Sequence, residues 1–254
     1  MNVTVVGSGT VVPRLERRQS CIVVRCGGET LALDLGSGAV RGMLHAGLDP
    51  FALDRVFITH LHPDHTSDLI PLLFSTNYSD PTTPRERPLM LAGPESFAGF
   101  WRLITDAYRG WLSGGYQNML ELPVRCPAPV EFSGYRLSWA PAKHRPESVA
   151  YRIEEPGGGS LVYTGDTEYS ESVVELAQGA HTLIVECSFP DDSPVPGHLT
   201  PEGASRIARE AGVSRVVLTH IFPPADGLDL PAEVHRAGYG GEIITAWDGL
   251  GLEV

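Results

Sequence analysis

The sequence predicts a mixed α/β fold in which short buried strands alternate with helices. Two observations lead to this prediction. Short apolar runs, too short for helices, recur along the chain and end in turns rich in Gly, Asp or His. Longer segments between them carry apolar residues three and four positions apart, which is the helical period. The 254 residues, 42% hydrophobic, can bury a substantial core, and without a linker they predict one domain over residues 1–254.

The acidic composition restricts the classes of partner. A formal net charge of −12 argues against broad binding to nucleic acid or anionic membrane, which needs a basic field. No apolar run is long enough to span a membrane, and the N-terminus lacks the pattern of a signal peptide. The four cysteines form no CxxC pair and are expected to be reduced thiols. We therefore expect a cytoplasmic protein with no membrane partner.

In the first half of the chain, β-branched and apolar residues cluster between turn signals. They predict strands and helices in turn. The expected strands are residues 3–6, 20–25, 30–35, 56–58 and 89–92, with a hairpin turn at Gly27-Gly28. The expected helices are residues 40–46 and 69–74, and one that begins after Pro94 and carries the apolar face Phe97, Phe100, Trp101, Ile104 and Tyr108.

The second half begins with a Gly- and Pro-rich segment, residues 109–130, which we expect to be a flexible loop able to cover a site. Strands follow at residues 135–140, 149–154, 160–163, 183–186, 216–218, 242–245 and 250–254. Helices are expected at residues 170–178 and 200–211, the second with Thr200 as its N-cap and Pro201 at its first position.

Four metal-binding side chains are concentrated directly after the predicted strand at residues 56–58. The segment is Thr59-His60-Leu61-His62-Pro63-Asp64-His65. Pro and Asp favour a tight turn there, so the imidazoles would lie at the edge of the sheet, within reach of a ligand. Imidazole and carboxylate together are the ligand set of zinc, iron or manganese in hydrolytic sites.

Three more candidate ligands stand at the ends of later predicted strands: His144, Asp166 and His220. Strand ends on one side of a sheet converge, so residues far apart in sequence can meet there. Asp34 stands at the end of the predicted strand 30–35. It is placed either to orient a metal-bound histidine or to cap a helix or turn.

This pattern resembles the metallo-β-lactamase superfamily in order and spacing. The residues that carry the resemblance are His60-x-His62-x-Asp64-His65, then His144, Thr164-Gly165-Asp166-Thr167 and Thr219-His220. The resemblance implies an αββα sandwich of two mixed sheets with helices outside. It also implies two metal ions, one held by His60, His62 and His144, the other by Asp64, His65 and His220, with Asp166 as the bridge. Asp64 as a ligand, with no cysteine in the corresponding place, departs from the true β-lactamases and points to the hydrolase branches of the superfamily.

A narrower resemblance is to the ribonuclease Z-like group. It is carried by Gly7-Ser8-Gly9 with Pro13, Arg18 and Ser20, and by residues 183–189 followed by His198-Leu199-Thr200. In that group, the residue matching His198 gives a proton to the leaving oxygen, and the acid matching Glu186 supports it. The resemblance thus implies His198, Glu186 and Asp64 as catalytic residues.

Two departures bear on the substrate. Only 21 residues separate His144 from Asp166, too few for the tRNA-binding arm of ribonuclease Z. The segment Ile221-Phe222-Pro223-Pro224 stands where the tRNA enzymes tend to carry Ser and Arg. With the acidic charge, these departures argue against tRNA and favour a small phosphodiester, such as a cyclic nucleotide or cyclic sugar phosphate.

The prediction is therefore a dinuclear metal-dependent hydrolase, most simply a phosphodiesterase for small or cyclic phosphodiesters, with RNA as a further substrate class. Two divalent cations, zinc first and manganese or iron as alternatives, would share Asp166 and a bridging hydroxide that attacks phosphorus. Arg18, Lys143 or Arg145 would contact the phosphate or remain solvated. The alternatives are a lactonase or thioesterase of the same fold, and a non-catalytic metal- or cofactor-binding protein. A homodimer is also implied, because relatives are often dimers.

Overall fold

Two seven-stranded mixed sheets form the centre of the computed structural model, which describes residues 1–78, 85 and 87–254. The first sheet has the spatial order β14 (Leu250–Glu253), β1 (Asn2–Gly7), β2 (Cys21–Cys26), β3 (Glu29–Leu33), β4 (Arg55–Phe57), β5 (Leu89–Gly93) and β6 (Gln117–Glu121). The second has the order β13 (Glu242–Thr245), β12 (Arg215–Thr219), β11 (Thr182–Glu186), β10 (Ser160–Tyr163), β9 (Val149–Glu154), β8 (Tyr135–Pro141) and β7 (Val130–Phe132).

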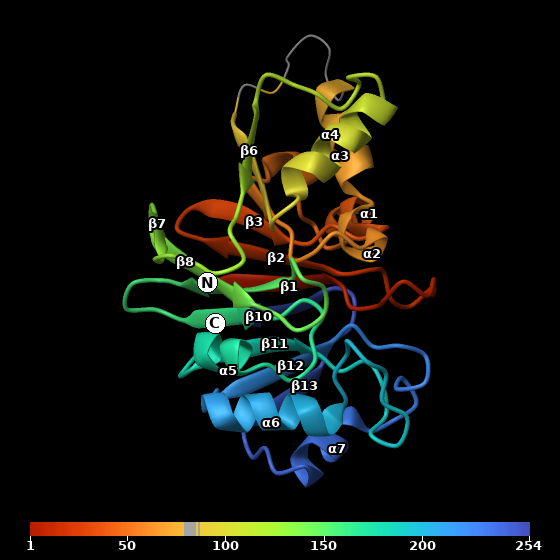
Figure 1. Cartoon of the computed structure of the whole chain (residues 1–254), viewed down its shortest axis with the longest axis vertical. Helices are drawn as coiled ribbons and strands as arrows, with labels where there is room; N and C mark the ends of the chain where they lie inside the picture. The colour runs from red at the N-terminus through yellow and green to blue at the C-terminus, as the bar shows by residue number, and fades with distance from the viewer. Residues whose placement is uncertain (79–84, 86) are drawn as a thin grey trace.

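Helices lie outside the two sheets, one group at each end of the molecule in Figure 1. The helices of the first half are α1 (Ala39–His45), α2 (Pro63–Thr66), α3 (Leu69–Tyr78) and α4 (Phe97–Ala107), with a 3₁₀ turn at Pro50–Ala52. Those of the second half are α5 (Glu171–Ala177), α6 (Pro201–Ala211) and α7 (Leu230–Arg236). The helix–sheet–sheet–helix order confirms the predicted αββα sandwich.

The central strands are continuously apolar because both of their faces are buried. In β12, Val216 and Leu218 pack with the helices outside the second sheet, whereas Val217 packs between the sheets. Successive side chains of a strand point to opposite faces, so a strand between two buried layers needs apolar residues at every position. This is why short apolar runs located the strands correctly.

The two sheets share one pairing pattern that places the site. In each sheet, three antiparallel pairings are followed by three parallel pairings. The parallel half runs from β3 to β6 in the first sheet and from β10 to β13 in the second. The carboxyl ends of parallel strands meet at one edge, where loops can bring polar residues together. Both parallel halves therefore supply side chains to a common edge.

The segment 109–130 differs from its predicted role as a loop over a site. Residues 117–121 form β6, which pairs in parallel with β5, and Trp111 packs against Phe74 and Tyr78 of α3. The prediction of a flexible loop that covers a site is therefore wrong, because this segment extends the first sheet and lies beside α3. Its weak alternation hid an edge strand that has little of its surface buried.

The structure tests two predictions about helices, the N-cap of α6 and the apolar face of α4. Thr200 occupies the N-cap position of α6, but its side chain makes no capping bond. Instead, the Asp191 carboxylate accepts the Glu202 N–H at 3.0 Å. Most of the predicted apolar face of α4 packs against the outer core of the first sheet, with Phe97 buried and Phe100, Trp101 and Ile104 partly buried. Tyr108 is the exception, because it is the C-cap of the helix and is exposed. Strand β7 and helix α7 were not predicted.

Among the described residues, no helix is long and apolar enough to cross a membrane. The cytoplasmic location and the single domain over residues 1–254 stay predictions.

Candidate metal centre

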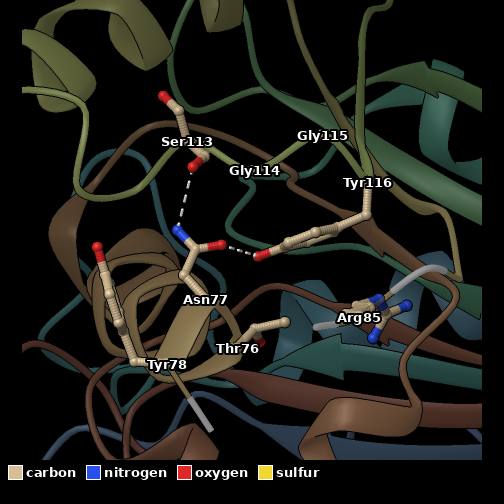
Figure 2. Close-up of a pocket in the computed structure, with 8 residues that line it drawn as sticks. All are labelled: Thr76, Asn77, Tyr78, Arg85, Ser113, Gly114, Gly115 and Tyr116. Atoms are coloured by element: carbon tan, nitrogen blue, oxygen red, sulfur yellow. Dashed lines mark hydrogen bonds between the residues drawn. The ribbon is translucent and has the colours of Figure 1, made fainter. Parts of the chain in front are cut away.

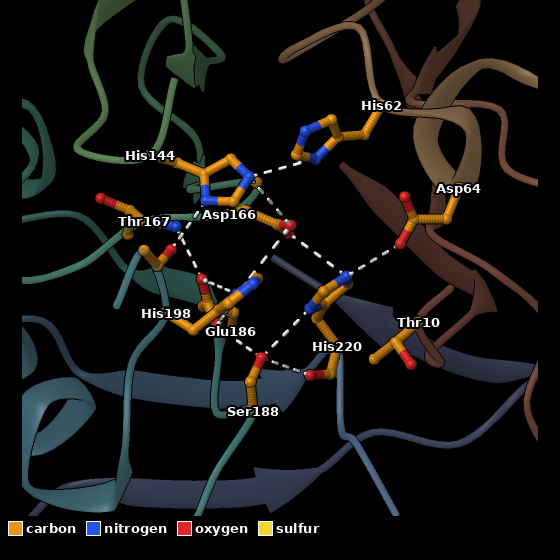
Figure 3. Close-up of polar contacts among 12 residues, drawn as sticks. Thr10, His62, Asp64, His144, Asp166, Thr167, Glu186, Ser188, His198 and His220 are labelled. Carbon is orange, nitrogen blue, oxygen red and sulfur yellow. Dashed lines mark hydrogen bonds and ion pairs between the residues drawn. The ribbon is translucent and has the colours of Figure 1, made fainter. Parts of the chain in front are cut away.

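The seven predicted metal ligands come together at the edge where both sheets end. Figure 3 labels five of them: His62, Asp64, His144, Asp166 and His220. The first sheet contributes the segment after β4, in which His62 is the N-cap of α2 and Asp64 and His65 lie within that helix. The short helix was expected to begin beyond these residues. The second sheet contributes His144 from the β8–β9 turn, and Asp166 and His220 from the ends of β10 and β12.

The ligands fall into two groups. His60, His62, His144 and Asp166 each offer an atom within 4.8 Å of the others, and so do Asp64, His65 and His220. These are the two sets that the superfamily resemblance implied.

Asp166 lies between the two groups. Its Oδ2 is 3.7 Å from His60 Nε2 and 3.8 Å from His144 Nε2. Its Oδ1 is 3.3 Å from His65 Nε2 and 3.4 Å from His220 Nε2. One carboxylate oxygen thus faces each group, which is the placement that a bridging ligand requires.

Three buried polar atoms at the centre support a cation site. His60 Nε2, His65 Nε2 and Asp166 Oδ1 have no hydrogen-bond partner among the described residues. Leaving such atoms unsatisfied costs about 1–3 kcal/mol each, so native proteins rarely do so. His62 Nδ1 and His144 Nε2 also face each other at 3.1 Å. Nitrogen and carboxylate donors that converge without protein partners fit divalent cations, and the cluster is able to hold metal ions.

The histidines are oriented through their other ring nitrogens. The Asp34 carboxylate can only accept, so His65 Nδ1–H donates to it, at 2.7 Å. By the same argument His144 Nδ1–H donates to the Gly197 carbonyl at 2.8 Å. Each bond turns Nε2 toward the centre, as is common for metal-binding histidines. Of the two roles open for Asp34, the structure shows the orienting one.

Asp34 is held in place by its own partners. Its carboxylate accepts the Thr59 N–H at 2.8 Å, the Thr59 hydroxyl at 2.9 Å and the Tyr163 hydroxyl at 2.9 Å. Its backbone φ is +60°, a left-handed conformation that Asp tolerates better than most residues. Tyr163 could not be recognised from the sequence, because a buried tyrosine in a strand is ordinarily part of the core.

The charges of the centre shift two of its pKa values in opposite directions. Burial lowers the pKa of His60 well below its usual value, and the neighbouring His65 lowers it further. Burial also opposes the charge on His65, but the carboxylates of Asp166 and Asp34 outweigh it and hold the pKa of His65 well above its usual value. A proton at His65 therefore competes with a cation, and metal binding would release it.

His198 and Glu186 form a pair beside the two groups. His198 Nδ1 lies 3.2 Å from both carboxylate oxygens of Glu186, which is fully buried. Burial lowers the pKa of His198, but the hydrogen bond and charge of Glu186 outweigh it, so the pKa lies above the usual value. His198 Nδ1 is also 4.0 Å from Asp166 Oδ2. His198 could thus serve as a proton donor or, with Asp166 and His220, as a ligand.

Ser188 connects this pair to His220, a contact that the sequence did not predict. Its hydroxyl donates to Glu186 Oε2 at 2.5 Å and lies 3.1 Å from His220 Nδ1 (Figure 3). The Thr167 N–H donates to Glu186 Oε1 at 2.6 Å. These bonds leave Glu186 able to hold only one orientation toward His198.

The basic residues near the centre are mostly paired. Lys143 forms an ion pair with Glu168 at 2.6 Å, and Arg18 forms one with Asp248 at 3.2 Å. Arg145 is exposed. Lys143 and Arg18 are therefore paired with carboxylates, and of the two roles left open for them, contact with phosphate gains no support.

A pocket of about 550 Å³ lies away from the metal centre, between α3 and the loop before β6 (Figure 2). Asn77 spans it: its side-chain nitrogen donates to the Ser113 carbonyl at 3.2 Å, and its oxygen accepts the Tyr116 hydroxyl at 2.7 Å. Arg85 donates to backbone carbonyls, including that of Pro88 at 3.1 Å. The described lining holds no carboxylate or imidazole for acid–base chemistry, so the metal centre is the better candidate.

Comparison with known proteins agrees with this geometry. The beta-lactamase superfamily domain matches residues 41–221, which is more than half of the chain. The chain belongs to the beta-lactamase superfamily. Within it, the chain is 31% identical to "Ribonuclease Z" of Methanothermobacter thermautotrophicus, over 87% of this chain and 86% of that protein. The ribonuclease Z-like branch and the metal-dependent hydrolase class are thereby confirmed.

Solved structures of superfamily members share the whole architecture. The metallo-beta-lactamase fold protein YhfI from Bacillus subtilis matches with a TM-score of 0.86 and 25% identity, over 99% of this chain and 98% of its own. The short form of human tRNase Z matches with a TM-score of 0.81 and 24% identity, over 100% and 99% of the two chains, which shows a shared fold. The superfamily comparisons give no support to the prediction against tRNA.

Proposed function

We propose that this chain is a dinuclear metal-dependent phosphodiesterase. The observation that carries the proposal is the position of Asp166, with one oxygen toward each histidine group. His198 lies beside it with its Nδ1 3.2 Å from both carboxylate oxygens of Glu186, which supports a role as proton donor. The relatives named ribonuclease Z support phosphodiester chemistry. RNA and small or cyclic phosphodiesters are both candidate substrate classes.

His60, His62 and His144 would hold one cation, and Asp64, His65 and His220 the other, with Asp166 shared. When bound, two divalent cations supply the charge that polarises the phosphoryl group and activates water at neutral pH. Zinc is the proposed metal, because imidazole and carboxylate donors suit it, and manganese or iron would fit the same donors.

This chain's own residues supply the proton. Glu186 accepts from His198 Nδ1–H, which leaves Nε2–H as the donor that can reach a substrate. A leaving alkoxide is a strong base, so its departure requires a proton in the transition state. The carboxylate of Glu186 favours the protonated ring, and Ser188 and Thr167 fix that carboxylate. The catalytic assignment is thus His198 as proton donor and Glu186 as its positioning residue.

The proposal is tested with purified protein loaded with zinc, manganese or iron. Elemental analysis should find about two metal ions per chain, and turnover of bis-p-nitrophenyl phosphate should disappear with a chelator and return with metal. A panel of cyclic phosphodiesters and a precursor tRNA would then rank the substrate classes. Turnover of a lactone or thioester but of no phosphodiester, or metal binding without any turnover, would contradict the proposal. The predicted homodimer is a separate matter for light scattering.

A further inference from the structure

A second pocket, of about 370 Å³, opens beside His198. Its walls come from segments well separated in the sequence: Tyr169 after β10, the loop 194–196, and the start of α6 at Thr200 and Gly203. His198 belongs both to this pocket and to the metal centre. His198 is thus a wall that the pocket shares with the metal centre.

The lining of this pocket is largely apolar. Pro194, Val195 and Pro196 form the exposed wall, and the buried Leu199 lies beneath. The one carboxylate in the described lining is Glu168, and it is already engaged by Lys143 at 2.6 Å and by the Gly197 N–H at 2.7 Å. No described lining residue is an arginine or lysine. The pocket thus suits an uncharged group and offers little to a second phosphate.

The proton donor fixes which part of a substrate lies here. A leaving oxygen must come within about 2.6–3.2 Å of His198 Nε2 to receive its proton. The group attached to that oxygen then extends beyond His198. Phe189 and Phe222 pack against the His198 ring, with centroids 5.7 and 5.6 Å away, and neither lines the pocket. The pocket is an open space that His198 itself lines, so it is the candidate location for that group.

We infer that this pocket binds the leaving alcohol of the phosphodiester and selects an alcohol with an uncharged apolar or flat group, such as a nucleoside. The inference rests on the proposed phosphodiesterase function, which it extends to the substrate's leaving side. The volume fits one ring system and is near the lower end for small-molecule sites. Val195 is then a specificity-determining residue of the reaction.

The experiment compares benzyl methyl phosphate with dimethyl phosphate, whose leaving alcohols have similar acidity and differ in the apolar ring. Metal-loaded protein should release benzyl alcohol in preference to methanol from the mixed ester. It should also favour this ester over dimethyl phosphate by about tenfold in kcat/KM, which corresponds to about 1.4 kcal/mol of selective binding. Val195→Asp should reduce this ratio to about threefold or less, because a carboxylate then competes with the ring for the pocket.

Val130→Asp is the matched control, since Val130 is a valine of nearly the same exposure, 37% against 38% for Val195, on the edge strand β7. It should keep the wild-type ratio. Equal release of the two alcohols, or an unchanged ratio in Val195→Asp, would overturn the inference. Binding is read separately from the shift of the Val195 methyl resonances on addition of benzyl alcohol. If benzyl alcohol shifts the Val195 resonances but no diester is hydrolysed, only the proposed phosphodiesterase function is refuted. If diesters are hydrolysed with neither a preference for benzyl alcohol nor a Val195 shift, the binding role of the pocket is refuted.

Discussion

Asp34 and His65 are joined by a 2.7 Å hydrogen bond between two side chains with no solvent exposure. The bond fixes the imidazole so that its Nε2 faces Asp166. Asp34 itself accepts three further bonds from Thr59 and Tyr163, so four donors converge on one carboxylate. An orienting bond of this kind determines how well a ligand binds as well as where it lies.

Asp34→Asn should therefore weaken metal binding about 10–100-fold. In asparagine an NH₂ group replaces one of the two carboxylate oxygens. At least one of the four donors that bond to Asp34 in the wild-type protein then has no acceptor. Competitive metal titration would measure the affinity, with circular dichroism to confirm the fold. Asp49→Asn, at an exposed turn, is the control and should bind metal normally. An unaltered affinity in the Asp34 variant would refute the orienting role.

His60→Ala should remove one metal ion per chain and nearly all turnover. His60 is fully buried, and its Nε2 has no other partner among the described residues, so its loss deprives the first group of a ligand. Elemental analysis and the bis-p-nitrophenyl phosphate assay measure the two effects. His235→Ala, at the exposed end of α7, should change neither. A His60 variant with full metal content would contradict the ligand set.

His198→Asn separates the two roles that the geometry permits. As a proton donor, His198 should matter most for poor leaving groups, with a loss of about 10²–10⁴-fold on a dialkyl phosphate and a far smaller loss on bis-p-nitrophenyl phosphate. Metal content should stay at the wild-type level. A parallel loss on both esters together with a loss of metal would instead identify His198 as a ligand.

Removal of metal should lower the melting temperature. Without cations the centre keeps buried donors that face one another unsatisfied, and a metal that binds only the folded chain adds stability by mass action. At about 100 times its dissociation constant, the gain is about 2.7 kcal/mol. Scanning calorimetry with chelator and with restored zinc would show it. Equal melting temperatures in both states would argue against a metal at this position.

The pH dependence of stability can be tested at Glu29, away from the metal centre. Arg55 donates two hydrogen bonds of 2.7 Å to its carboxylate, and these, with a bond from Tyr135, lower the pKa of Glu29 despite its partial burial. A depressed folded-state pKa means that the stabilisation is present above the unfolded pKa and is lost as the pH falls through the folded one.

Glu29→Gln should thus lower stability at pH 7 by at most about 1 kcal/mol and flatten its decline below pH 4.5, the ordinary value for this group. Urea titrations across pH 3–7, a range of about four units around the Glu pKa, would measure the change. Glu175→Gln, on the exposed face of α5, should leave the profile unaltered. If both variants showed the same acid response, the ion pair would contribute nothing.

The fold was predictable because of how the strands are buried. A strand such as β12, enclosed on both faces, is apolar along its centre at residues 216–218, and the polar residues Thr219 and His220 mark where it ends. Edge elements lack that constraint. Strand β6 exposes four of its five residues, so its sequence looked like a loop. Helix α7 has seven residues and buries only Leu230 and Val234, so its apolar pattern was too short to predict a helix.

The centre was predictable for its ligands and less so for what surrounds them. Histidines and aspartates at strand ends are rare enough to be informative. Ser188, Thr59 and Tyr163 are common residues whose partners lie far away in sequence, as with the 129 positions between Tyr163 and Asp34. Such contacts depend on the way the two sheets stack, which no local pattern records.

The cluster takes His60 and His65 from one sheet and Asp166 and His220 from the other, so it straddles the seam of the sandwich. Bound cations would cross-link the two sheets there, and a shift of one sheet along the other by a fraction of an ångström would separate the ligands. We therefore expect heat inactivation to run ahead of melting. Turnover that persisted up to the midpoint of the calorimetric transition would show that the two sheets keep their relative position until the protein unfolds.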